Sequence, residues 1–303
     1  MSARERGVAA VTAILIVAIA ASAATLMLAQ QSAMVDQAML ISSRAQADQY
    51  ARAGIGWAIG VLRQDPRAYD SLGEAWAQPI AALPVERALI SGTITDEQGK
   101  FNLNNLVRPN GGPSAVDIEI FESLLASLGL PRELSQAVRD WIDPDADLAG
   151  PAGAEDAYYL SLRKPYRAAN APMSQVEELY RVRGFDAPTV AKLKPYVTAL
   201  PSGTWINVNT ASEVLLRAAL PRASDDLLAK FLRERQAKPA TSKSEIWQRL
   251  HLSDREDRPV EVKSDYFSVR VQVAQDEVEL VSEALVARMQ TGRTALAWLR
   301  PRY

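Results

Sequence analysis

Residues 8–29 read Val8-Ala-Ala-Val-Thr-Ala-Ile-Leu-Ile-Val-Ala-Ile-Ala-Ala-Ser-Ala-Ala-Thr-Leu-Met-Leu-Ala29, which is 22 residues without a charge. Only Thr12, Ser22 and Thr25 are polar. As an α-helix this stretch would be about 33 Å long, enough to cross a bilayer core of about 30 Å. Arg4 and Arg6 precede it, and the positive-inside rule then keeps the N-terminus in the cytoplasm. We therefore expect a single membrane-spanning helix with the rest of the chain on the opposite side.

The helical pattern continues beyond this stretch. No Pro or Gly occurs from Val8 to Ala53, and Ala51, Ile55, Ala58, Ile59 and Leu62 recur at helical spacing. The sequence thus predicts one helix of about 55 residues, roughly 80 Å long. A secretory signal peptide is the alternative, but its apolar part is typically only about 7–15 residues.

Composition excludes several classes of protein. The chain has 303 residues, 48% of them apolar, with 34 Lys+Arg, 36 Asp+Glu, one His and no Cys. A formal net charge of −2 argues against a strongly basic nucleic-acid binder. Without Cys there can be no disulfide, thiol nucleophile or Cys-ligated metal, and His251 alone cannot form a multi-His site. No nucleophile–base pair, P-loop or dinucleotide fingerprint is present, so we do not expect an enzyme.

Strand patterns lie on both sides of a helical interval. Residues 66–86 contain three prolines and are expected to be loop, whereas residues 89–103 predict two short strands around a turn at Glu97-Gln98-Gly99. Tyr266–Val273 alternates strictly, and residues 278–289 and 294–299 read as further strands. Because residues 102–262 read as helical, we expect an α+β fold. In it, a long N-terminal helix and an antiparallel sheet are interrupted by an inserted all-α domain.

The helical interval contains a repeat. Phe101-Asn-Leu-Asn and Ile206-Asn-Val-Asn share a signature, and each precedes a helix that ends at Leu-Pro-Arg, at residues 130–132 and 220–222. Second helices are expected at 133–141 and 225–235. Third helices are expected after Ser174 and Ser242, each with Glu three residues on. The first copy alone carries an acidic insertion of about 30 residues.

The chain's beginning resembles a known processing site. Arg6-Gly7 directly before the apolar run is similar to the prepilin peptidase site of type IV pilins and type II secretion pseudopilins. The resemblance implies cleavage between Gly7 and Val8 and N-methylation of Val8. Most members of these families have Glu at the fifth mature residue, where this chain has Thr12. In these filaments the Glu of one subunit is thought to pair with the N-terminal amine of a neighbouring subunit, because a buried ammonium is costly without a partner. A subunit without that Glu cannot offer this pair to a subunit added above it and can only cap the filament. An ordinary single-pass anchor with an accidental Arg-Gly is the alternative.

Six carboxylates crowd into residues 140–156. Asp143, Asp145 and Asp147 alternate, and Glu155 and Asp156 close the run. The spacing begins like an EF-hand, but Leu148 stands where the turn glycine should be. Oxygen-rich loops can bind Ca²⁺ without being EF-hands; the alternative is a solvated acidic loop.

A wider resemblance covers essentially the whole chain. Asp-Trp-x-Asp-x-Asp, Gly-Ala-Glu-Asp-x-Tyr-Tyr, Pro-Tyr-x-x-x-Asn and Glu-Leu stand at 140–145, 153–159, 165–170 and 178–179. With Thr12, they resemble the type II secretion minor pseudopilin K family. The resemblance implies a non-enzymatic cap that helps initiate the pseudopilus, anchored in the bacterial inner membrane with a periplasmic C-terminal domain. Its partners would be the minor pseudopilins I and J, with H below, and the prepilin peptidase. It also implies Ca²⁺ bound by the following residues: Asp143, Asp145, Asp147, Glu155, Asp156 and Asn170.

The same resemblance divides the chain. It implies a leader peptide at 1–7, an N-terminal helix at 8–65 with 8–29 in the membrane, and a pseudopilin core split between 66–101 and 263–303. The inserted α-domain, with two repeats, spans 102–262. Its helix pairs resemble helix-hairpin-helix (SAM-like) modules, which makes a membrane-anchored, competence-type DNA-binding protein the alternative function. Those modules grip phosphates through a Gly-x-Gly hairpin, whereas the second copy has Leu220-Pro-Arg-Ala-Ser there. We therefore expect no nucleic-acid partner.

Overall fold

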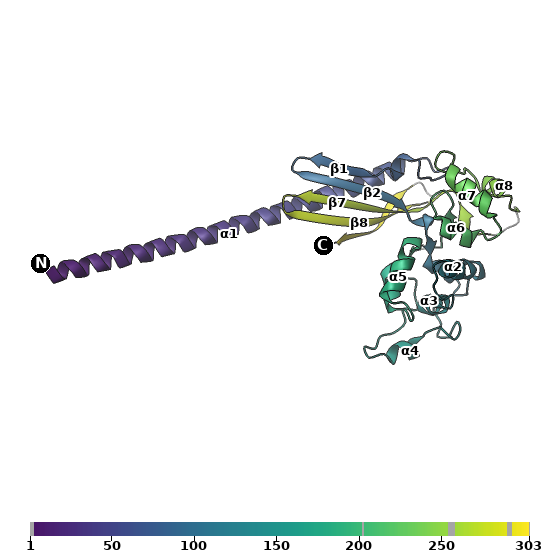
Figure 1. The fold of residues 1–303 in the computed structure, drawn as a ribbon, viewed down its shortest axis with the longest axis horizontal. Helices are drawn as coiled ribbons and strands as arrows, with labels where there is room; N and C mark the ends of the chain where they lie inside the picture. The colour runs from purple at the N-terminus through teal and green to yellow at the C-terminus, as the bar shows by residue number, and fades with distance from the viewer. Residues whose placement is uncertain (1–2, 202, 254–257, 290–292, 303) are drawn as a thin grey trace.

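The protein is built on one very long helix. A computed structural model describes residues 3–201, 203–253, 258–289 and 293–302, and helix α1 spans Ala3–Gln64 (Figure 1). At about 1.5 Å per residue its 62 residues extend about 93 Å. Side chains 11–42 are all exposed, whereas Ala47, Ala51, Ile55, Ala58 and Leu62 are buried. The predicted long helix with an apolar face in its second half is confirmed.

That buried face packs on an antiparallel sheet in the order β1-β2-β7-β8-β9. The strands are β1 (Ile80–Val85), β2 (Ala88–Asp96), β7 (Tyr266–Gln275), β8 (Val278–Arg288) and β9 (Thr294–Arg302). The alternating residues Phe267, Val269, Val271 and Val273 of β7 meet α1 in one apolar core. We call the part of α1 from Ala47 onward, together with this sheet, the body. The three strands predicted near the C-terminus are confirmed.

Strand β1 corrects the expectation that residues 66–86 form only loop. It pairs with β2 at the edge of the sheet, with an irregularity between Ile80 and Leu83. Pro84 fits this position because an edge strand does not need every backbone N–H. A 3₁₀ turn, η1 (Ala75–Ala77), precedes the strand and buries Trp76.

The segment between β2 and β7 (residues 97–265), here called the insert, is mostly helical. Its helices are α2 (Ala115–Ser127), α3 (Leu134–Ile142), α4 (Asp156–Leu160), α5 (Ala187–Leu193), α6 (Glu213–Ala219), α7 (Asp225–Glu234) and α8 (Lys243–Arg249). The 3₁₀ turns are η2 (Glu97–Gly99), η3 (Leu103–Leu106), η4 (Val176–Arg181) and η5 (Lys194–Tyr196). The insert lies beyond the end of the sheet that is farther from the chain's N-terminus (Figure 1).

The second strand expected after Glu97-Gln98-Gly99 does not continue the sheet. Instead β3 (Phe101–Asn102) forms a short parallel pair with β4 (Val197–Thr198). In the same way β5 (Ile206–Asn207) pairs with β6 (Val260–Glu261). The hairpin expectation fails because β2 takes β7 as its neighbour, about 170 residues later in the chain.

The repeated Asn-x-Asn signature has a physical basis. The Asn104 amide donates to the carbonyls of Met173 and Leu200, and its oxygen accepts from Met173 N at 2.8 Å. Asn209 does the same with Ala240, donating to its carbonyl and accepting from its N–H, both at 2.9 Å. Each second Asn therefore ties a repeat's first turn to the start of its third helical segment, so the repeat is real in three dimensions.

The third helical segment of the first copy differs from its prediction, whereas that of the second copy does not. Helix α8 is α-helical, and the Ser242 hydroxyl accepts from Glu245 N as expected. In the first copy the segment is the 3₁₀ helix η4, and the Ser174 hydroxyl donates to Glu178. The matching contact in the second copy joins Thr241 to Glu245. The spacing of four, not three, is what the two copies share.

Candidate functional site

The acidic loop, residues 140–156, joins α3 to α4. Helix α4 lies at the far side of the insert from the sheet (Figure 1). Asp140 and Asp143 come from the end of α3, and Glu155 stands at the N-terminus of α4. Asn170 approaches from the following connection, where its amide donates to the Asp145 carbonyl at 3.1 Å.

Buried oxygen atoms without a partner gather in this loop. Among the described residues, Asp140 Oδ2, Asp143 Oδ1, both Glu155 carboxylate oxygens and Asn170 Oδ1 are buried and accept no hydrogen bond. Buried polar atoms are nearly always paired, and an unpaired one costs about 1–3 kcal/mol, more when charged. Five unpaired oxygens from four residues are the donor set that a hard cation such as Ca²⁺ prefers.

The local backbone holds these residues in place. Asp140 Oδ1 accepts from Ala149 N at 2.8 Å, which fixes one side of that carboxylate. A Cβ at Gly153 would lie 2.2 Å from Asp140 Oδ2, so any larger residue would have to displace that carboxylate. Asn170 adopts φ +43°, a left-handed conformation that Asn tolerates better than most residues. These contacts give the acidic loop a defined conformation.

Electrostatics agree with the geometry. Burial, and then the nearby carboxylates led by Asp140 and Asp143, raise the pKa of Glu155 to about 7. Burial, followed by Asp145 and Asp140, raises the pKa of Asp143 to about 6. Ionisation of both groups is therefore unfavourable in this loop, and a bound cation would favour it.

The remaining predicted ligands are arranged differently. Asp145 and Asp147 are exposed, and Asp145 Oδ1 accepts from Asp147 N at 2.9 Å. Asp156 accepts from Ala168 N at 3.0 Å and lies 3.6 Å from Arg167. Within the described residues, no three carboxylates of the loop have oxygens all within 4.8 Å of one another. Of the predicted ligands, Asp143, Glu155 and Asn170 thus have buried oxygens without a partner, whereas Asp145 and Asp147 are exposed and Asp156 is half-buried and hydrogen-bonded.

Asp140 is the buried acid that sequence reasoning did not assign as a ligand. It lies on α3, three residues before Asp143, which directly follows the helix, and a spacing of three brings side chains to the same side of a helix. That spacing was a usable signal. What the sequence did not show is that the chain returns at Gly153 to enclose the carboxylate.

The other predicted site is the N-terminal helix. Gly7 and Val8 lie within α1, and their side chains are outside the described ones, whereas Thr12 is exposed. Helix α1 is long and apolar enough to cross a membrane, and none of its apolar window is buried. Ala47 is the first buried residue among the side chains described from residue 11 onward. The body therefore begins about 27 Å along the helix beyond Ala29.

Two family models match the chain, both described as "Type II secretion system (T2SS), protein K", over residues 99–202 and 206–270. The type II secretion system protein K of Pectobacterium carotovorum is 31% identical over 294 residues, covering 90% of this chain and 89% of that protein. This chain belongs to the type II secretion system protein K family. The protein K of Pseudomonas aeruginosa is 38% identical over 229 residues, covering 71% of this chain and 68% of that protein.

A solved structure from a complex that contains a protein K is also similar to this chain. A chain of the crystal structure of the GspK-GspI-GspJ complex from enterotoxigenic Escherichia coli is similar with a TM-score of 0.74. It is 26% identical, and the match covers 86% of this chain and 97% of that one. The predicted family and fold class are confirmed. The alternative of a DNA-binding protein gains no support, because these relatives are components of a secretion system.

Proposed function

We propose that this chain is a non-enzymatic minor pseudopilin that caps the tip of the type II secretion pseudopilus and helps initiate its assembly. The observation that carries the proposal is the shape of the molecule: an apolar helix with an exposed first half extends from one end of the sheet, and a bulky insert lies beyond the other end (Figure 1). Helix α1 can pack against partner helices, while the insert would block a further subunit from above. The similarity to a chain crystallised with GspI and GspJ supports the same role.

The anchoring is part of this proposal. The first half of α1 would lie in the inner membrane with its N-terminus in the cytoplasm, as Arg4 and Arg6 require, and the body and insert would be periplasmic. The prepilin peptidase would cleave between Gly7 and Val8. Mass spectrometry of the protein from cells with an active peptidase should give a chain that begins at N-methylated Val8. A chain that retains Met1–Gly7 would contradict this step.

The partners are proposed to be the minor pseudopilins I and J, with H below them. Affinity purification of the full chain from detergent-solubilised membranes should recover I- and J-type pseudopilins together. Ile16→Lys should reduce that recovery because a charge would interrupt the exposed apolar surface of α1. Failure of I and J to co-purify with the unaltered chain would overturn the tip role.

Calcium is proposed to stabilise the acidic loop. Asp143, Glu155 and Asn170 would hold the ion through their unpartnered oxygens, with Asp140 beside them. Asp145, Asp147 and Asp156 would contribute charge or ligands through water. The ion would neutralise the crowded carboxylates and fix the loop. Calorimetric titration of the chelator-treated full chain should show binding, and no heat at millimolar Ca²⁺ would exclude the site.

A further inference from the structure

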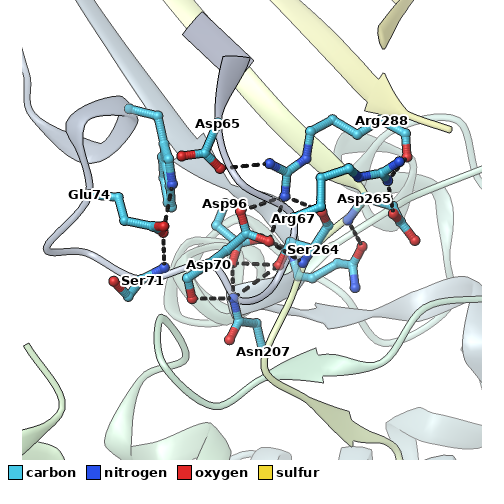
Figure 2. Close-up of polar contacts among 12 residues, drawn as sticks. Asp65, Arg67, Asp70, Ser71, Glu74, Asp96, Asn207, Ser264, Asp265 and Arg288 are labelled. Atoms are coloured by element: carbon cyan, nitrogen blue, oxygen red, sulfur yellow. Dashed lines mark hydrogen bonds and ion pairs between the residues drawn. The ribbon is translucent and has the colours of Figure 1, made fainter. Parts of the chain in front are cut away.

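A buried polar cluster holds the insert on the body. It lies where the end of α1, the connection after it, the ends of β2 and β8, and the start of β7 meet strand β5 of the insert (Figure 2). We call it the joint. Its charged and polar members are Asp65, Arg67, Asp70, Glu74, Asp96, Asn207, Ser264, Asp265 and Arg288.

Arg288 is the central cation of the joint. Its guanidinium is 2% exposed, lies 2.9 Å from Asp65 and donates to both carboxylate oxygens of Asp70. It also donates to the Ser264 carbonyl at 2.7 Å and covers the ring of Phe267 at 4.5 Å. One guanidinium therefore pairs with two carboxylates, those of Asp65 and Asp70.

Asp96 links the joint to the insert. Its Oδ2 accepts from the hydroxyl of Thr210 at 2.6 Å and from the amide of Asn207 at 2.8 Å. The Asn207 amide also donates to the backbone carbonyl of Asp70, and Ser264 N donates to the Asp70 carboxylate at 2.7 Å. Asp70 and Asp96 are thus bridged through Asn207 and Ser264, and both carboxyls are buried.

The joint contains more acids than it can neutralise. Asp65 and Asp70 pair with the one guanidinium of Arg288, and Glu74 has an oxygen within 4.8 Å of theirs. Asp96 is held by neutral donors, and the remaining cation, Arg67, is paired with Asp265 at 3.0 Å. Carboxylates as close as those of Asp65, Asp70 and Glu74 repel when all are ionised, and one proton among them reduces that repulsion. Burial, opposed by Arg288, raises the pKa of Asp70 to about 7, and burial raises those of Asp65, Glu74 and Asp96.

A metal ion is a poorer explanation of the cluster. Oxygens of Asp65, Asp70 and Glu74 lie within 4.8 Å of one another, but each carboxylate already accepts hydrogen bonds from the protein. Arg288, with its unpartnered Nε, occupies the position where a cation would reduce the repulsion. A proton supplies the missing positive charge without displacing any of these groups.

We infer that a proton shared at Asp70 controls how firmly the insert is held on the body, so that the joint is tight in mild acid and loosens as the pH rises. An acid whose pKa is raised by folding stabilises the folded state fully below its ordinary value near 3.8, and this stabilisation is lost as the pH rises through about 7. The stabilisation therefore declines from about pH 4 to about pH 7, and the interval from pH 6 to pH 8 contains about the last tenfold of the change. This inference does not rest on the proposed secretion role.

Hydrogen–deuterium exchange on the full chain in detergent, with saturating Ca²⁺, tests the joint directly. After correction for intrinsic rates, segments 204–212 and 260–266 should be about tenfold better protected at pH 6 than at pH 8. Segment 268–273 in the middle of β7 should be unchanged. Equal protection of the joint segments at the two pH values in the unaltered protein would overturn the inference.

Variants test whether the pH dependence of the protection comes from the proton at Asp70. Asp70→Asn should abolish the difference between pH 6 and pH 8, whereas Asp226→Asn, at an exposed position in the first turn of α7 and outside the joint, should keep it. Asn207→Asp adds a carboxylate beside Asp96 and should make the difference larger, with folding favoured at pH 6. If Asp70→Asn keeps the difference, or if Asn207→Asp leaves it unchanged, the inference is wrong.

Discussion

Glu155 is the residue on which the proposed calcium site depends most, because both of its carboxylate oxygens are buried and unpartnered. Glu155→Gln should keep the shape of the side chain, remove its charge and weaken Ca²⁺ binding by about 100-fold or more, given that even supporting residues cost about 10–100-fold in metal affinity. Isothermal titration calorimetry would measure this. Glu133→Gln is the matched control, since Glu133 is exposed and makes no side-chain capping bond at α3. Equal affinities for the two variants would remove Glu155 from the site.

The same residues predict a pH dependence of the calcium-free protein. The pKa values of Glu155 and Asp143 are raised to about 7 and about 6 from ordinary values of 4.5 and 3.8. Their contribution to stability is therefore present at low pH and is lost as the pH rises through 6 to 7. In chelator the melting temperature should fall from pH 5.5 to pH 8, and saturating Ca²⁺ should make that fall smaller. Since the joint contributes equally with and without Ca²⁺, the difference reports the acidic loop. An identical fall in both conditions would contradict this reading.

At the scale of elements, the contact between α1 and β7 distinguishes three glycines of one helix. A Cβ at Gly54 would lie 3.0 Å from Val271 Cγ1, whereas Gly56 and Gly60 have nothing within 4 Å. Gly56→Ala should stabilise the chain by about 0.5–1 kcal/mol through helix propensity. Gly54→Ala should stabilise the chain less than Gly56→Ala does, by about 1 kcal/mol or more, because the added methyl group crowds the core. Chemical denaturation of the two variants in detergent compares them, and an equal gain would show that α1 packs less closely than described.

At the scale of the whole molecule, the insert should be removable. Asp96 of β2 and Phe267 of β7 are antiparallel partners, so a short Asp-Gly turn could replace residues 98–265 and join the strands as a hairpin. The shortened chain should retain α1 and co-purify with I and J. It should no longer block addition above it, so that longer pseudopili form. Electron microscopy of sheared filaments would measure their length against cells with the full chain. Unchanged length, with the variant present in the filaments, would argue against a steric cap.

Part of the candidate site was predictable and part was not. The alternation of Asp143, Asp145 and Asp147 identified the loop, and Glu155 and Asn170 came from the family resemblance. Burial then separated residues that the sequence treats alike: Asp143 faces inward, while Asp145 and Asp147 are exposed. A local pattern cannot show this, because the return of the chain at Gly153 determines which carboxylates are enclosed.

The sequence by itself determined the elements whose signal is local. A charge-free run without Pro or Gly specifies α1, strict alternation specifies β7, and two copies of Asn-x-Asn specify the repeat, since these depend on neighbours a few residues apart. Only the tertiary structure decided that β1 is a strand, that β3 pairs with β4, and that Arg288 pairs with Asp65 and Asp70. These depend on partners up to some 220 residues away, and desolvation and pairing across such distances leave no periodic trace in the chain.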